Sequence, residues 1–398
     1  MLPAELLLEI VARSDTRTLI RSAASCKLLR HDILSPHFIR RVTQQGAIVP
    51  PCILAFLNTH AGGPDRPPPL LSLVSPATPA AAAFLDTHLS PSVSRTMDDL
   101  LREHSPLLSR GGLVVLYSRP HISSKLSNLC VYDPITGQRS FLSYPPGINP
   151  KNFFAGNFST CIFLTAADGI NCSFLLFFPT LVTRCNKESI TKTVKVYIAT
   201  STTATWAPAP MSSRVSCLLF QRWCKVRFDA VILHGGVIHW LLRYSGVIVT
   251  YNVRTMEHGT INLLGHITNF KGRLYLGSHH GRKLICLLGV NGFNISVWHQ
   301  LPSGDWPLEA VTINVEETLR PLDVDMSLGG SSLIVLHCAG EEGSVVLLRT
   351  YCYGPSKSLL FNLDLETMEI RVQRDSFLTS LLLEVDLSSR LRAMKVFS

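Results

Sequence analysis

Charged side chains make up only 16% of this 398-residue chain, whereas hydrophobic residues make up 46%. So little charge excludes a chain that is disordered over most of its length, because there is ample apolar surface for a large core. At about 150 residues per domain, the length predicts two or three units. The net charge of +9 is scattered and forms no dense basic run, so nucleic acid is not expected as a partner.

The sequence also lacks an uninterrupted apolar run of about 20 residues, the length that an α-helix needs to cross a bilayer. Its richest apolar stretch, residues 152–182, is broken by glycine, aspartate, asparagine and proline. The first residues do not resemble a secretory leader, because Pro3, Glu5 and Glu9 follow Leu2 closely. We therefore expect no membrane partner and an intracellular location, in the nucleus, the cytoplasm or both.

Motifs for catalysis and for metal binding are missing as well. The 11 cysteines show no C-x-x-C spacing, which argues against a disulfide framework and against a zinc site. His234, His239 and the pair His279-His280 have no carboxylate or cysteine at ligand spacing. There is no G-x-S-x-G motif, and the Gly235-Gly236 pair lacks the strand–glycine–helix context of a phosphate loop. We expect no catalytic residue, no metal and no cofactor, and a protein that is not itself an enzyme.

Residues 1–42 are predicted to form a small all-α module. Apolar residues at helical spacing make one stripe on the first helix: Leu2, Leu6, Leu7 and Ile10. Ser14-Asp15 is a candidate cap for a second helix, and residues 26–34 are expected to form a third. Ser35-Pro36 places a cap before a proline in the first turn, which predicts the start of a fourth helix. Some forty residues cannot bury all of these side chains internally, so we expect an apolar stripe that another surface covers, either a partner or the protein's own second domain.

The segment 43–105 is predicted to be a connector rich in proline and alanine. It contains Pro67-Pro68-Pro69 and the run Pro79 to Ala83, which favour extended chain without a core of its own. The triple proline has two interpretations, a ligand for a proline-binding module or an exposed loop between units. The composition favours the loop.

Residues 106–386 change to β-type patterning, and residues 387–398 are expected to be a tail. Strands are predicted at 111–117, 129–132 and 140–142, and 231–242 is predicted to be two strands around Gly235-Gly236. Further strands are predicted at residues 247–251, 271–276, 295–298, 332–336 and 359–363. The five tryptophans could line a binding face or pack between sheets, and packing is the commoner use.

A turn with one sequence pattern recurs three times in this region. The hexads Tyr132–Gly137, Tyr251–Met256 and Leu363–Met368 each contain an apolar residue, Asp or Asn, two variable residues, Thr, and then Gly or Met. The carboxylate or amide can bond its own backbone, and the last position suits a left-handed conformation. With about 40–50 residues per propeller blade, the spacing leaves room for copies in between. The predicted fold class is α+β multidomain: an all-α module followed by an all-β propeller of about six blades.

The amino-terminal module resembles the F-box in the order Leu2-Pro3-Ala4-Glu5-Leu6-Leu7-Leu8-Glu9-Ile10, followed by Ser25-Cys26-Lys27-Leu28-Leu29. Leu29 stands where many members of that family have tryptophan. The resemblance implies a helical surface that docks the Skp-type linker subunit of a cullin–RING ubiquitin ligase. Carried over by position, that surface would consist of Leu2, Pro3, Leu6, Leu7, Ile10, Cys26 and Leu29.

The strand-rich region resembles the kelch-like, F-box-associated propeller of plant F-box proteins, most closely the group expanded in grasses. The resemblance lies in 108–116, in 131–137 and in the segment from His234 to Leu241. It implies a rigid disc whose variable loops bind a target protein that the sequence does not name.

Together the two resemblances imply a substrate-recognition adaptor of a Skp–cullin–F-box ubiquitin ligase, which acts by proximity and supplies no reacting group. The alternative is a lectin-like binding module or an enzyme on a propeller, unconnected to ubiquitination. Bound metal detected by elemental analysis would support the enzyme.

Overall fold

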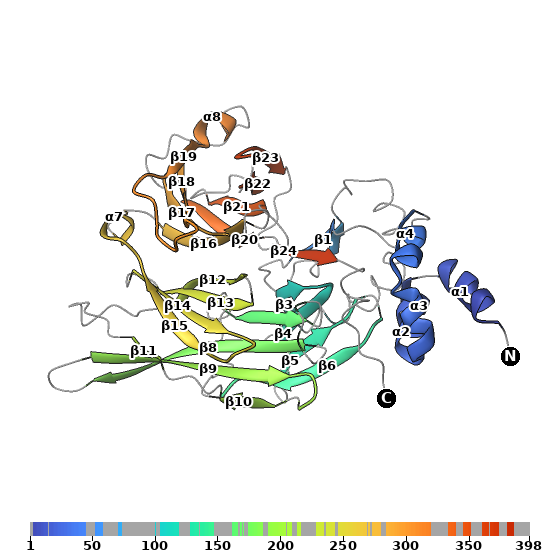
Figure 1. The fold of residues 1–398 in the computed structure, drawn as a ribbon. Coiled ribbons are helices and arrows are strands. Elements are labelled where there is room, and N and C mark those ends of the chain that lie inside the picture. The colour runs from blue at the N-terminus through green and yellow to red at the C-terminus, as the bar shows by residue number, and fades with distance from the viewer. Residues whose placement is uncertain are drawn as a thin grey trace, which may run out of the picture.

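Four helices precede a region of antiparallel sheets in the computed structural model of the chain (Figure 1). The helices are α1 (Ala4–Ala12), α2 (Thr16–Ser25), α3 (Lys27–Ile33) and α4 (Pro36–Gln44). The structure describes residues 3–14, 16–44, 52–58, 71–73, 100, 104–118, 128–134, 136–146, 161–165, 168, 170, 174–185, 190–203, 205–208, 213–215, 228–234, 236–242, 246–268, 270, 273–279, 284–319, 333–339, 345–351, 360–365, 367–373 and 380–385.

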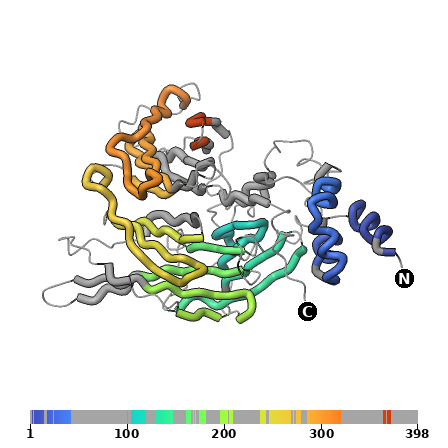
Figure 2. The backbone as a smooth tube through the Cα atoms, viewed as in Figure 1, coloured from blue at the N-terminus to red at the C-terminus, as the bar shows by residue number. Residues whose placement is uncertain are grey.

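The helices form a module with its own core. α1 contacts the other three helices, and α3 contacts α2 and α4. The buried apolar side chains come from all four helices: Val11, Ala12, Leu19, Ile20, Ala23, Ile33, Phe38, Ile39 and Val42. The module lies beside the ring of sheets and not within it, as the backbone tube in Figure 2 shows.

The helix boundaries follow the sequence pattern with two differences. The prediction at Ser35-Pro36 is confirmed: Pro36 begins α4, and the Ser35 hydroxyl accepts a hydrogen bond from the Phe38 amide at 3.2 Å. Ser14 lies at the end of α1, where its hydroxyl donates a hydrogen bond to the Val11 carbonyl at 2.8 Å. Cys26 precedes α3 in an extended conformation, so the third helix begins one residue later than expected.

The described strands form six sheets. Sheet A has the order β2 (Leu71–Leu73), β1 (Cys52–Asn58), β24 (Ser380–Val385). Sheet B contains β3 (His104–Arg110), β4 (Leu113–Ser118), β5 (Asn128–Tyr132) and β6 (Arg139–Ser143). Sheet C contains β7 (Ile162–Thr165), β8 (Phe174–Cys185), β9 (Ile190–Thr200), β10 (Trp206–Pro208) and β11 (Ser213–Val215).

The remaining three sheets have four strands each. Sheet D contains β12 (Phe228–His234), β13 (Val237–Leu242), β14 (Val247–Asn252) and β15 (His258–Asn262). The short helix α7 (Gly265–Thr268) follows it. Sheet E contains β16 (Arg273–His279), β17 (Leu284–Asn291), β18 (Asn294–His299) and β19 (Val311–Asn314), followed by α8 (Glu316–Leu319). Sheet F contains β20 (Leu333–Ala339), β21 (Val345–Tyr351), β22 (Leu360–Asp364) and β23 (Ile370–Gln373).

The sheets are arranged in a closed cycle, which makes the fold a β-propeller. One end strand of each sheet contacts the end strand of the next, in the order β24, β3, β7, β12, β16, β20 and back to β24. Each of the sheets B, D, E and F is a meander of strands consecutive in the sequence. The prediction of short helices followed by a propeller is therefore confirmed.

Sheet A joins the two ends of the strand-rich region. β1 and β2 lie within the segment 43–105 that the sequence predicts to be a connector, and β1 pairs with β24 from Cys52↔Val385 to Asn58↔Ser380. The propeller also begins earlier than residue 106, because β3 starts at His104. The physical reason is closure: a ring of sheets removes its open edge when a strand from one end pairs with a strand from the other.

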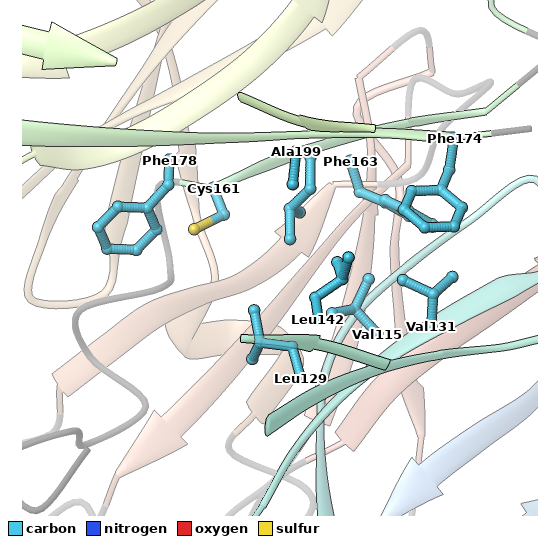
Figure 3. Close-up of a cluster of buried hydrophobic side chains, with 10 residues drawn as sticks. Val115, Leu129, Val131, Leu142, Cys161, Phe163, Phe174, Phe178 and Ala199 are labelled. Carbon is cyan, nitrogen blue, oxygen red and sulfur yellow. The ribbon is translucent and has the colours of Figure 1, made fainter. Parts of the chain in front are cut away.

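The core between sheets B and C illustrates how neighbouring sheets pack (Figure 3). Side chains from sheet B, such as Val115 and Leu142, face Phe174 and Ala199 from sheet C. The rings of Phe163 and Phe174 are 5.9 Å apart between centroids and tilted by 46°. These buried contacts between consecutive sheets supply most of the apolar burial that stabilises such a ring.

An ion pair fixes the same boundary. The Arg110 guanidinium at the end of β3 donates to Asp168 at 2.8 Å, and the Asp168 carboxylate also accepts the Thr165 amide at 2.8 Å. Next to this pair, Gly111 has φ of +54°, and a Cβ there would lie 2.6 Å from the Thr165 hydroxyl oxygen. Only glycine fits this turn without strain.

The three turn hexads of the sequence adopt one conformation, at the hairpins β5–β6, β14–β15 and β22–β23. Asp133, Asn252 and Asp364 each accept, through a side-chain oxygen, the amide of the threonine three residues later, at 3.3, 3.1 and 3.2 Å. The sixth position is left-handed in all three, with φ of 74° at Gly137, 60° at Met256 and 58° at Met368. The recurring pattern is therefore a structural repeat.

Replacing Met256 by glycine is expected to stabilise the propeller by about 0.5–1 kcal/mol. A left-handed conformation costs a residue with a Cβ roughly 1–2 kcal/mol and costs glycine nothing, whereas glycine loses somewhat more chain entropy on folding. The methionine is 54% exposed, so little burial is lost. Urea unfolding should show a higher midpoint for Met256→Gly and a lower one for the control Arg254→Gly, whose backbone has no positive φ. Equal shifts in both variants would contradict this account.

Candidate docking face on the helical module

Helix α1 has two apolar faces, and only one of them packs against the protein. Val11 and Ala12 are 5% and 1% exposed and belong to the core of the module. Leu6, Leu7 and Ile10 are 51%, 38% and 56% exposed, and Pro3 before the helix is exposed too. Positions 3, 6, 7 and 10 are neighbours along one side of an α-helix. Most of the stripe that the sequence predicts is therefore an outward face.

The rest of the predicted docking set lies at the start of α3, which contacts α1. Cys26 is exposed and Leu29 is half-buried. Leu2 lies outside the described residues. The structure thus places the described part of the predicted set on two helices that touch.

Leu28, between Cys26 and Leu29, is also exposed, and the predicted docking set omits it. The sequence predicts that Leu28 lies within the third helix, and its side chain is 78% exposed. The buried position of this helix is Ile33. The sequence signal that could have found Leu28 was its position between Cys26 and Leu29, which are both in the predicted docking set.

The Glu9 carboxylate links α1 to α4 and so helps to fix how α1 is oriented. The Glu9 carboxylate forms a salt bridge with Arg13 at 2.7 Å along α1 and a second with Arg41 on α4. The hydrogen bond from Arg41 is the largest cause that lowers the pKa of Glu9. Glu9 therefore stays ionised at neutral pH and links the two helices.

Metal ligands and thiols are two kinds of reactive group among the described residues. No group of three or more His, Cys, Asp or Glu side chains among them is placed to hold a metal ion. The described buried thiols are poor nucleophiles, because burial raises the pKa of Cys130 to about 11 and that of Cys286 to about 12. Of the candidate histidines, His239 is buried within β13.

The tryptophans described by the structure pack between sheets. Trp240 is fully buried, and Trp298 and Trp306 are each 5% exposed. Trp206 is half-buried, and its ring nitrogen donates to the Ser143 carbonyl at 2.7 Å. Trp223 lies outside the described residues.

Within the part of the chain that the structure describes, no helix has the length and apolar character required to span a bilayer.

Comparison with known proteins gives structural likeness only. No family model matches the chain, and no curated protein matches its sequence. The structure of a periplasmic gluconolactonase from Pseudomonas aeruginosa is 10% identical, covers 80% of this chain and 81% of that chain, and has a TM-score of 0.39. A member of the DUF4221 family from Bacteroides vulgatus is 10% identical, covers 67% of this chain and 80% of its own, and has a TM-score of 0.33.

A third similar structure is the extracellular domain of a protein described as a hybrid two component system, from B. thetaiotaomicron. It is 13% identical, with a TM-score of 0.32, and covers 68% of this chain. The present chain spans only 29% of the length of that extracellular-domain chain.

Proposed function

We propose that this protein is the substrate-recognition adaptor of a Skp–cullin–F-box ubiquitin ligase. The helical module acts as an F-box that docks the Skp-type linker subunit, and through it the cullin–RING ligase. The propeller binds the target protein. The role places the protein in the nucleus or the cytoplasm, where such a ligase meets its targets.

The observation that carries the proposal is the outward apolar face of α1. The module already has a core, so the side chains of Leu6, Leu7 and Ile10 are not needed to hold its helices together. Covering half-exposed side chains of this size is worth about 1 kcal/mol each. A partner that covers them gains this free energy, and the neighbouring Cys26, Leu28 and Leu29 extend the surface.

The propeller is proposed to be the six-bladed, kelch-like, F-box-associated type. Six sheets in a closed cycle of contacts support this count. α4 ends at Gln44, and β1 of the closing sheet begins at Cys52, so few residues separate the docking module from the ring. A short connection of this kind keeps a bound target close to the ligase, which raises its effective concentration at the ubiquitin-charged enzyme.

Replacing Leu6 and Leu7 by charged residues should abolish binding of the linker. The double variant Leu6→Asp/Leu7→Asp places two charges on the surface that the linker must desolvate, which costs several kcal/mol. The full chain and a Skp-type linker are co-expressed, and the linker that co-purifies is quantified. We expect at least about a hundredfold less linker with the double variant.

The matched control is Phe141→Asp, because Phe141 on β6 is 50% exposed and lies in the propeller. This variant should retain the linker in full. Circular dichroism must show both variants folded. Undiminished linker with the double variant would exclude the docking role and would favour a propeller unconnected to ubiquitination.

A further inference from the structure

Two segments at the boundary of sheets D and E pack together as one unit. The first runs from Leu263 to Thr268 and contains α7, and the second is the loop 300–310 between β18 and β19 (Figure 1). The His266 ring nitrogen Nε2 lies 3.1 Å from the Pro307 carbonyl. Trp306 is buried in the same cluster as Leu263 and Ile267. The tryptophan therefore anchors the second segment against the first.

The loop 300–310 is also ordered by its own hydrogen bonds. The Leu301 amide donates to the Asp305 carbonyl at 2.8 Å, and the Gly304 amide donates to the Leu301 carbonyl at 2.8 Å. The Gln300 side chain donates to the Gly304 carbonyl, also at 2.8 Å. A loop fixed in this way loses little conformational entropy when a partner binds to it.

This unit carries most of the exposed large hydrophobic side chains described on the propeller. Leu264, Leu301 and Val311 are 44%, 45% and 51% exposed, and Leu308 is 80% exposed. The only others described on the sheets and their turns are Phe141 and Met256. Single exposed leucines are ordinary, but here Leu264 lies in one segment, Leu301 and Leu308 lie in the segment that contacts it, and Val311 directly follows that second segment. We refer to Leu264, Leu301, Leu308 and Val311 as the rim patch.

The charge around the rim patch has the opposite sign to that of the whole chain. Asp305 and Glu309 are exposed beside the leucines, and neither forms a salt bridge with another described residue. His266 is the one residue in the two segments that could carry a positive charge, and its ring nitrogen lies against the Pro307 carbonyl. In a chain of net charge +9, this is a local acidic site. A complementary partner would present leucine-like side chains flanked by lysine or arginine.

We propose that the rim patch docks a basic amphipathic segment of the target protein. The apolar side chains of that segment lie on Leu301 and Leu308, and its cations pair with Asp305 and Glu309. The inference names the class of target for the adaptor and in that respect rests on the proposed function. The binding itself is independent of the linker.

The test uses the purified full chain and two labelled 14-residue synthetic peptides. One has leucine at helical spacing with lysine at all other positions, and the second has glutamate in place of each lysine. Fluorescence anisotropy should show saturable binding of the lysine peptide, weakened at higher salt. The variant Leu301→Ser/Leu308→Ser should weaken binding by about tenfold or more, as expected for the loss of central apolar anchors. The variant Asp305→Asn/Glu309→Gln should weaken it about threefold to tenfold.

Two controls keep the outcome specific. Phe141→Ser removes an equally exposed ring elsewhere on the propeller and should not change the dissociation constant. Leu6→Asp/Leu7→Asp should also bind the lysine peptide normally, so a failure of linker docking is distinguished from a failure of target docking. If the double variant is unstable, the single variant Leu308→Ser replaces it in the binding measurement, because Leu308 is 80% exposed. No saturable binding, equal binding of the glutamate peptide, or an equal loss with Phe141→Ser would overturn the proposal.

Discussion

A chain that ends before Ser380 is expected to lose the closed propeller. It lacks β24, which pairs with β1 along its whole length and also contacts β3 and β20. Without this strand, β1 keeps only the short strand β2 as a partner in sheet A, and the facing edges of sheets B and F are uncovered. We expect the free energy of unfolding to fall by several kcal/mol, which is a large fraction of the roughly 5–15 kcal/mol of an ordinary domain. Urea unfolding followed by near-ultraviolet circular dichroism measures the change.

The control for this truncation is a chain that ends after Val385 and keeps every described strand. It should unfold with the same cooperativity and nearly the same midpoint as the full chain. If the chain without β24 unfolds like this control, then the ring does not depend on pairing between its first and last strands.

Replacing Trp240 by alanine is expected to destabilise the propeller by about 3–5 kcal/mol. The side chain lies on β13, is fully buried, and belongs to the cluster that joins sheets C and D. Phe177 from sheet C and Tyr251 from sheet D are in the same cluster, with ring centroids 5.9 Å apart. An alanine would leave a cavity at this boundary that the surrounding strands cannot fill by moving.

Graded controls separate cavity formation from a general effect of losing tryptophan. Trp240→Phe should cost clearly less than Trp240→Ala, because it fills most of the volume. Trp206→Ala removes a half-buried side chain with one hydrogen bond to Ser143 and should cost about 1–2 kcal/mol. Equal urea midpoints for all three variants would contradict the assignment of Trp240 to the packed boundary.

The repeated turns show which parts of the fold are local. The Asp or Asn, the threonine and the left-handed residue of each hexad interact within six positions of the chain, so their spacing in the sequence was enough to predict them. The hairpin between β12 and β13, in which His234 pairs with Val237, was predictable for the same reason. Neither prediction required knowledge of which sheets are neighbours.

The candidate docking face could be predicted only in part. Helical spacing grouped Leu6, Leu7 and Ile10 correctly on one side of α1, but spacing alone does not say which of two apolar sides packs inward. The predicted docking set omits Leu28, although its side chain is 78% exposed. The choice depends on how α1 and α3 pack together, and no local pattern contains that contact.

The helical module, the antiparallel meanders and their turns were predictable because each depends on residues that are close along the chain. The pairing of β1 and β2 with β24, in a segment predicted to be a connector, could be seen only in the folded ring. The same is true of the way in which Trp306 holds two distant segments together and leaves the rim patch exposed. These features require contacts between residues far apart in the sequence, whose pairing is selected by burial and ring closure and not by local conformational preference.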